Sequence, residues 1–191
     1  RRGDLVVLPT DTVYGVGADA FNSTAVGDLL EAKGRGRGMP SPVLVGSPNT
    51  LHGLVTDFSE KAWELVDAFW PGALTVVARH QPSLTWDLGE THGTAAIRMP
   101  LHPVALELLK DFGPMAVSSA NLTGHPAPQD CDAAKEMLGD AVAVYLDGGP
   151  TVDTVPSSIV DVTGRVPVLL RAGAISEEEL RKVVPDLEIA R

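Results

Sequence analysis

Three cations alternate with glycines at residues 33–38, and these residue types suit the binding of phosphate. Lys33, Arg35 and Arg37 are each followed by a glycine, which lets the backbone turn tightly and approach a ligand closely. Lysine supplies a compact charge, and arginine supplies a planar fork that matches phosphate oxygens. A solvated loop, in which Gly34 ends a helix and the cations favour its dipole, explains the same residues. The residues alone leave both interpretations open.

Hydroxyl groups and a carboxylate follow the first predicted strand, within residues 9–17. Thr10, Thr12 and Tyr14 supply the hydroxyls, and ligands often bind where the strands of a sheet end. An ordinary polar turn, in which Asp11 and Thr12 bond to nearby backbone, explains the same residues. Taken by itself, the turn is the simpler interpretation.

Polar side chains also lie at the ends of three later strands. Ser118, Ser119 and Asn121 are able to bond to phosphate, ribose or a base, although turns of this composition are common. Arg98 and Arg171 each end an apolar run, and a guanidinium that becomes buried needs a partner. That partner is either a structural carboxylate, which is the commoner case, or a bound anion.

The sequence lacks the motifs of several other kinds of active site. The sequence contains no C-x-x-C, no H-E-x-x-H, no G-x-S-x-G and no Walker A pattern. Its five histidines are scattered at no metal-ligand spacing. The single cysteine, Cys131, begins a predicted helix and is interpreted as a small buried hydrophobe. We therefore expect neither a metal site nor a covalent nucleophile.

Alternating strand and helix signals must position these candidates. Apolar spacings of three and four predict helices that begin near Ser23 or Thr24, Ser59, Pro103, Asp130 and Ser176. Short apolar runs predict strands at 5–8, 43–45, 74–78, 95–99, 115–118, 142–146, 158–162 and 166–170. This alternation predicts a sheet with helices packed on it, and the hairpin spacings near 142–170 indicate mixed pairing. The expected class is α/β, or α+β in some schemes, with one domain over residues 1–191.

Charge and composition limit the partners and the cellular compartment that the protein can have. The 191 residues carry a formal net charge of −10, which counts against broad binding to nucleic acid. No apolar run approaches the roughly 20 residues that cross a bilayer, and one cysteine fits a reducing compartment. We expect a cytoplasmic protein. The first residue is not methionine, so we also expect that an N-terminal piece is missing.

Seven segments resemble the YrdC family of threonylcarbamoyl-adenylate synthases, in the family's order and spacing. They are PTDTVYGVG (9–17), the K-x-R of Lys33 and Arg35, FWPGALTVV (69–77), TAAIRMP (94–100), VSSANLTG (117–124), SSIVD (157–161) and LLRAG (169–173). The resemblance covers nearly the whole chain. It implies a YrdC-like fold, an open, twisted, mixed β-sheet with helices packed on it.

The resemblance also implies a concave, positively charged cleft. Its K-x-R and S-x-N signatures correspond to Lys33, Arg35, Ser119 and Asn121, of which Lys33 and Arg35 would act in catalysis by stabilising charge. The implied ATP-binding residues are Lys33, Arg35, Arg37, Thr94, Ser119, Asn121 and Arg171. The implied threonine-binding residues are Thr10, Thr12, Tyr14, Arg98, Ser118 and Ser157.

The implied reaction joins L-threonine, bicarbonate and ATP, and it releases pyrophosphate. Its product, threonylcarbamoyl-AMP, serves the threonylcarbamoyladenosine modification of tRNA next to the anticodon. ATP is then a substrate, and Mg²⁺ would arrive with the nucleotide. The glycine-rich loop at 34–38 would close to exclude water. The implied partners are downstream threonylcarbamoyl-transfer proteins, with tRNA contact left open and no membrane involved.

The sequence departs from the family's pattern after the K-x-R arginine. The family often has proline there, whereas this chain has Gly36 followed by Arg37, which leaves open which arginine meets phosphate. The chain resembles the short form without an extra C-terminal domain. Two alternatives remain: a module that binds double-stranded RNA or tRNA without adenylation, and a carbamoyl-transfer domain of the hydrogenase-maturation type. The acidic charge counts against the first, and the single cysteine counts against the second.

Overall fold

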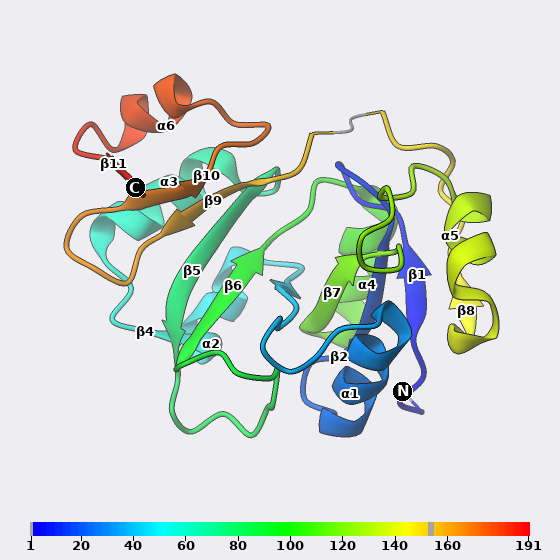
Figure 1. The fold of residues 1–191 in the computed structure, drawn as a ribbon. Coiled ribbons are helices and arrows are strands. Elements are labelled where there is room, and N and C mark those ends of the chain that lie inside the picture. Colours follow the sequence, from blue (N-terminus) through cyan, green and yellow to red (C-terminus); the bar gives the residue numbers. More distant parts are fainter. Residues whose placement is uncertain (1, 153–154) are drawn as a thin grey trace.

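One twisted sheet forms the centre of the structure, a computed structural model that describes residues 2–152 and 155–191 (Figure 1). The strand order is β11-β10-β9-β5-β6-β3-β7-β2-β1-β8, and β4 pairs with the free part of β5. The strands are β1 (Val6–Leu8), β2 (Gly15–Asp19), β3 (Val43–Leu44), β4 (Val55–Thr56), β5 (Leu74–His80), β6 (Thr94–Arg98), β7 (Met115–Ser119), β8 (Val144–Tyr145), β9 (Ser158–Asp161), β10 (Val168–Arg171) and β11 (Glu188–Ile189).

The sheet is mixed, which confirms the prediction from the hairpin spacings. Neighbours β3 and β6, β5 and β9, β1 and β8, and β10 and β11 are parallel. The longest ladders, β5 with β6 and β2 with β7, are antiparallel. Strands from both ends of the chain therefore meet in one sheet, because β9 and β10 add to the free side of β5.

Six α-helices in the described part of the chain cover the sheet, and none is long and apolar enough to cross a membrane. Figure 1 shows α1 in front of the sheet and α4 behind β7. The α-helices are α1 (Ser23–Lys33), α2 (Leu51–Leu54), α3 (Glu60–Phe69), α4 (Pro103–Phe112), α5 (Cys131–Leu138) and α6 (Glu177–Val183), with short 3₁₀ turns η1 (Pro48–Thr50) and η2 (Gly139–Ala141).

The core divides between the two faces of the sheet because side chains alternate along each strand. In β7, Met115 and Val117 pack with Leu109 of α4 in one cluster. Ala116, which lies between them in sequence, belongs to the larger cluster on the opposite face, together with Leu29 of α1. Helices α1 and α4 are thus held on opposite faces of the sheet by burial of their apolar residues.

Local capping chemistry begins most helices where the sequence predicts. The side chains of Ser59 and Asp130 cap α3 and α5, and Ser176 forms a reciprocal capping box with Glu179 at α6. Helix α1 begins at Ser23, as predicted, but its cap was expected at Ser23 or Thr24 and lies one residue earlier. Asn22 is the cap and accepts from the Ala25 N–H at 3.0 Å, because an asparagine oxygen serves this position as well as a serine does.

Strand β2 is the main element that the sequence analysis missed. Residues 9–17 were interpreted as a polar turn, yet Gly15–Asp19 pairs with both β1 and β7. Its glycines weaken the strand signal, and the structure shows why one is needed. A Cβ at Gly15 would lie 2.5 Å from a methyl carbon of Val117. The strand predicted at 142–146 shortens to Val144–Tyr145, and β4, β11 and α2 are further elements without a prediction.

Leu29→Ala should lower the free energy of unfolding by about 2–5 kcal/mol, because it leaves a cavity beneath α1. Leu29 is 0% exposed. Leu101→Ala is the matched control, since Leu101 is 57% exposed, and it should change that free energy by less than about 0.5 kcal/mol. Urea denaturation of both variants measures the difference. Equal effects would contradict the placement of α1 on the sheet.

Candidate functional site

A cavity of about 390 Å³ lies between the half of the sheet that contains β5, β6, β9 and β10 and the half that contains β1, β2 and β7. Side chains and backbone from nine separate segments form its wall. The lining residues are Thr10, Thr12, Val13, Tyr14, Gly15, Arg35, Pro42, Leu44, Thr75, Arg98, Val117, Ser118, Ser119, Ala127, Pro156, Ser157 and Arg171. Most of the predicted site residues are among them, including the hydroxyls of the first segment.

Arg98 forms the most buried ion pair of the described structure. Its Nη2 donates to Asp11 Oδ1, its Nη1 donates to Thr12 Oγ1 at 3.1 Å, and its Nε donates to the Gly72 carbonyl at 3.0 Å. Burial lowers the pKa of Arg98, and the charge of Asp11 opposes that shift. The partner of this strand-end arginine is therefore a structural carboxylate. Asp11 was noted only as a turn residue, and nothing local in the sequence links it to Arg98.

Arg35 and Arg171 face the cavity with only neutral oxygens as their partners among the described residues. Arg35 donates from Nε to Thr123 Oγ1 and from Nη1 to Ser118 Oγ, each at 3.1 Å. Arg171 donates from Nη2 to the carbonyl of Ser157 at 2.8 Å and to its Oγ at 3.2 Å. Burial, and then the nearby charge of Arg98, lowers the pKa of Arg171. Two cations that have no counter-charge among the described residues make this wall suitable for an anion.

Lys33 lies behind that wall and does not line the cavity. It is 1% exposed. Its Nζ donates to the carbonyl of Ser119 and, at 2.9 Å, to the carbonyl of Asn121. Burial, and then the charge of Arg35, lowers the pKa of Lys33 from 10.5 to about 8. The ammonium thus joins the end of α1 to the residues after β7.

Asn121 is also engaged behind the wall. Its Nδ2 donates to the carbonyls of Leu122 and His125 at 2.9 and 2.8 Å, which shapes the loop that follows β7. The Asn121 N–H donates to the Ser119 carbonyl at 2.9 Å, and the same carbonyl accepts from Lys33 Nζ. Lys33 and Asn121 therefore hold Ser119 in place at the cavity.

Two predicted ATP-binding residues lie away from the cavity. Arg37 donates to Asp87 at 2.7 Å on the protein surface. Thr94 begins β6 and donates to the Thr91 carbonyl at 2.9 Å. Arg98 stands four residues further along the same strand, which corresponds to about 13 Å. The structure therefore brings Arg35 to the cavity and leaves Arg37 and Thr94 outside it.

The hydroxyls of the first segment are used within the protein. Tyr14 Oη donates to the Gly149 carbonyl at 2.6 Å and accepts from the Gly148 N–H at 3.1 Å, and burial raises its pKa. Thr10 Oγ1 donates to the Val13 carbonyl at 2.7 Å. These bonds shape the β1–β2 turn and anchor residues 148–149 beside it, so the turn presents a rigid wall to the cavity.

Thr75 is a cavity residue that sequence reasoning missed. Its Oγ1 lies 2.8 Å from Ser157 Oγ, so these hydroxyls form a hydrogen bond that links β5 to the start of β9. Ser157 in turn accepts from Arg171. Thr75 lies in FWPGALTVV, which was used only for the resemblance. A threonine within an apolar strand was the available signal.

A metal-binding cluster is not found in the described ranges: no group of three or more histidine, cysteine, aspartate or glutamate side chains could hold an ion there. The polar surface of the cavity consists of guanidinium groups, hydroxyls and backbone. This chemistry suits the oxygens of phosphate or carboxylate.

The chain belongs to a known family, whose model matches most of its length. The family model named Sua5/YciO/YrdC, described as telomere recombination, matches residues 1–173. A Mycobacterium tuberculosis protein, provisionally named a threonylcarbamoyl-AMP synthase, is 59% identical over 184 residues, which are 96% of this chain and 85% of that protein.

Two other relatives are longer proteins. The Bacillus subtilis threonylcarbamoyl-AMP synthase is 39% identical, and the match covers 99% of this chain and 55% of that one. The structure of Pyrococcus abyssi Sua5 complexed with L-threonine superposes with a TM-score of 0.93 at 37% identity, over 98% of this chain and 56% of Sua5. This chain therefore spans about half of these two relatives.

A structure of HypF in a phosphate- and nucleotide-bound form has a TM-score of 0.78 at 19% identity, and the match covers 28% of that chain. This likeness shows a shared fold alone.

Lys33 should make the free energy of unfolding depend on pH between about 8 and 10.5. In this window the unfolded chain binds a proton that the folded protein has lost, because the folded pKa is the lower one. Stability should therefore rise with pH, by at most about 1.4 kcal/mol per unit. Urea denaturation from about pH 7 to 10 measures it.

Lys33→Met is the reference for that measurement, since it removes the titrating group and keeps an unbranched chain. The difference in stability between the two proteins should be flat below about pH 7.5 and should then change in favour of the wild type. A difference that stays constant up to pH 10 would show that the buried ammonium keeps its ordinary pKa.

Proposed function

We propose that this chain is an L-threonylcarbamoyladenylate synthase, which converts L-threonine, bicarbonate and ATP into threonylcarbamoyl-AMP and pyrophosphate. One observation carries the proposal: Arg35 and Arg171 line one cavity with only neutral partners among the described residues. A triphosphate supplies the missing negative charge. The family, and the name shared by the relatives at 59% and 39% identity, support this reaction above others that use the same charge pattern.

The phosphates of ATP belong on the arginine side of the cavity. Arg35 and Arg171 would contact them directly, and Ser119 would donate from its hydroxyl. Lys33 and Asn121 would act from behind, because they hold Ser119 in place. Arg37 and Thr94 are assigned no contact with ATP, since neither lines the cavity.

The amino acid belongs on the side formed by the β1–β2 turn. Arg98, fixed by Asp11, would face the threonine carboxylate, and Ser118 and Ser157 would bond to its polar atoms. Thr10, Thr12 and Tyr14 would shape this end as a preformed wall. P. abyssi Sua5, 37% identical to this chain, has been solved with L-threonine, which supports an amino-acid subsite in this fold.

The chemistry then needs positioning more than a reactive side chain. The amine of threonine attacks bicarbonate, and loss of water gives a carbamate. A carbamate oxygen attacks the α-phosphorus of ATP, and the bond to pyrophosphate breaks. Charge builds on the phosphate oxygens in this step, where preset guanidinium groups stabilise it.

Mg²⁺ fits this site only as a companion of the nucleotide. Because the described chain offers no cluster of metal-binding side chains, phosphate oxygens and water would be its ligands. The ion would add positive charge beside the arginines. The product would serve tRNA modification in the cytoplasm, passed to threonylcarbamoyl-transfer proteins.

The two alternative functions gain no specific support. A double-stranded RNA-binding surface conflicts with the net charge of −10. A carbamoyl-transfer role of the hydrogenase-maturation type would rest on the HypF likeness, which shows a shared fold alone.

The purified protein should release pyrophosphate and form threonylcarbamoyl-AMP only when L-threonine, bicarbonate and Mg-ATP are all present. Arg35→Ala should lower the turnover by roughly 10²–10³-fold, as expected for loss of a preset donor to the developing charge. Liquid chromatography with mass detection measures the adenylate.

Arg79→Ala is the control for that variant, because Arg79 is an exposed arginine of β5 outside the cavity. It should keep wild-type turnover. Absence of the adenylate with all three substrates, together with salt-sensitive binding of double-stranded RNA, would instead favour the RNA-binding alternative.

A further inference from the structure

We propose that Asp87 is a positioning residue for the phosphate side of the site. It acts through Arg37 and holds residues 34–38, the glycine-rich loop, so that Arg35 faces the cavity. This inference rests on the proposed function, and it gives Arg37 a role other than contact with phosphate.

Two hydrogen bonds join the glycine-rich loop to the connection between β5 and β6, and a third, within the connection, holds the Asp87 carboxylate. Arg37 Nη2 donates to Asp87 Oδ1 at 2.7 Å. The same oxygen accepts from the Gly89 N–H at 3.1 Å. The Glu90 N–H donates to the Arg37 carbonyl at 2.8 Å. We call these four residues the clasp.

The clasp is built at a point where two backbones come close together. Gly89 has a φ of +109°, and a Cβ at this residue would lie 2.7 Å from the carbonyl oxygen of Arg37. Glycine is the residue that permits both this conformation and this approach. The backbones of residues 37 and 89 are therefore in close contact, so the clasp does not depend on the Arg37 side chain alone.

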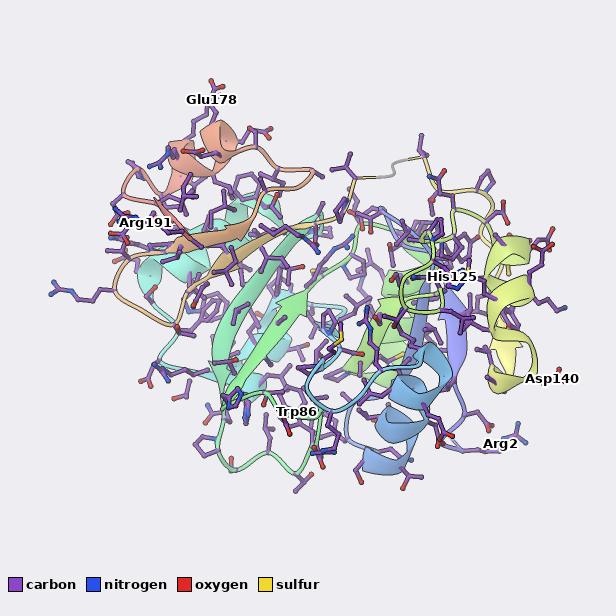
Figure 2. All side chains as sticks on the ribbon, viewed as in Figure 1. Arg2, Trp86, His125, Asp140, Glu178 and Arg191 are labelled. Carbon is purple, nitrogen blue, oxygen red and sulfur yellow. The ribbon has the colours of Figure 1, made fainter. Side chains whose placement is uncertain are left out.

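The connection between β5 and β6 gives the clasp a firm base. Trp86, next to Asp87, is buried and stacks on Phe21 at 5.6 Å between ring centroids, with the His80 ring edge-on at 5.7 Å. Figure 2 shows Trp86 between this connection and α1. Leu88 is buried as well. Asp87 thus lies between two buried side chains, which fix its position in the connection.

The glycine-rich loop has little packing of its own. A Cβ at Gly34 or Gly36 would meet nothing within 4 Å, and glycines lose the most conformational freedom on ordering. The loop is fixed at one end by Lys33, whose ammonium is buried, and at the other by Arg37. Arg35 lies midway between these two fixed points, so its orientation depends on both.

The expected effect of losing the clasp follows from how exposed its ion pair is. The side chains of Arg37 and Asp87 are 60% and 46% exposed, and an exposed ion pair contributes little to stability by itself. Loss of the clasp should therefore loosen the loop without unfolding the protein. Salt should weaken the clasp in the same direction, since it screens exposed charges.

Steady-state kinetics of Asp87→Asn tests the inference. We expect the KM for ATP to rise about three- to tenfold, because part of the binding energy of ATP is then used to order the loop. We expect kcat and the KM for threonine to stay within about twofold of wild type, since bound ATP holds Arg35 in place. Asp87→Glu should recover part of the loss. Asp67→Asn, which changes an exposed aspartate of α3, is the matched control and should leave all constants unchanged.

A charge swap separates positioning from phosphate contact. The double variant Arg37→Asp with Asp87→Arg should restore the KM for ATP relative to each single variant, because the pair is re-formed with the charges exchanged. A double variant as impaired as Arg37→Asp alone would overturn the inference, since Arg37 would then act on the nucleotide itself. An equal fall in kcat and in kcat/KM for Asp87→Asn would overturn it as well.

Amide hydrogen exchange over residues 34–38 gives a readout that needs no reaction. Exchange should be faster in Asp87→Asn than in wild type, and equal exchange would overturn the clasp. If wild-type protein makes no threonylcarbamoyl-AMP, the proposed function fails, and exchange still decides whether the clasp holds the loop. If wild type is active and Asp87→Asn has the same KM for ATP, the clasp fails and the function stands.

Discussion

The buried ion pair between Arg98 and Asp11 is the contact on which the site depends. A guanidinium taken out of water is costly unless a carboxylate and further acceptors surround it, and here Asp11, Thr12 and the Gly72 carbonyl provide them. Arg98 ends β6 in one half of the sheet, whereas Asp11 lies in the β1–β2 turn of the other half. The pair therefore sets how the two halves meet, and with that the shape of the cavity between them.

Around this pair, the basic groups divide into three roles according to their surroundings. The charge of Arg98 is neutralised by Asp11, and the Lys33 ammonium donates its hydrogen bonds to backbone carbonyls. Neither residue therefore presents an unbalanced charge at an open surface. Arg35 and Arg171 meet only hydroxyls and carbonyls within the described structure, and they keep their charge directed at the cavity. An acidic protein thereby concentrates a positive field in one small place.

The sequence was most informative where structure is local. Ser59 and the Ser176–Glu179 pair identify helix starts, because caps are made by residues three apart. Strand-end hydroxyls and arginines identify many of the residues that line the cavity. Contacts between distant residues could not be predicted: Asp11 with Arg98 and Asp87 with Arg37 look like unrelated charges in sequence. For the same reason the sequence could not show which of Arg35 and Arg37 faces the cavity. Strand β2 was not predicted because its glycines weaken the strand signal.

The parallel pairing of β5 with β9 bears on how the protein is made. Leu74 lies opposite Ser158 in this ladder, so Ser157 and Arg171 join the sheet only after a long stretch of chain has been synthesised. A nascent chain that has emerged only as far as α5 already contains the turn, the glycine-rich loop and Arg98, yet it lacks one wall of the cavity. Closure of such distant pairings is slow. On the ribosome, the nascent chain should therefore become able to bind an anion late, when β9 and β10 join the sheet and complete the cavity.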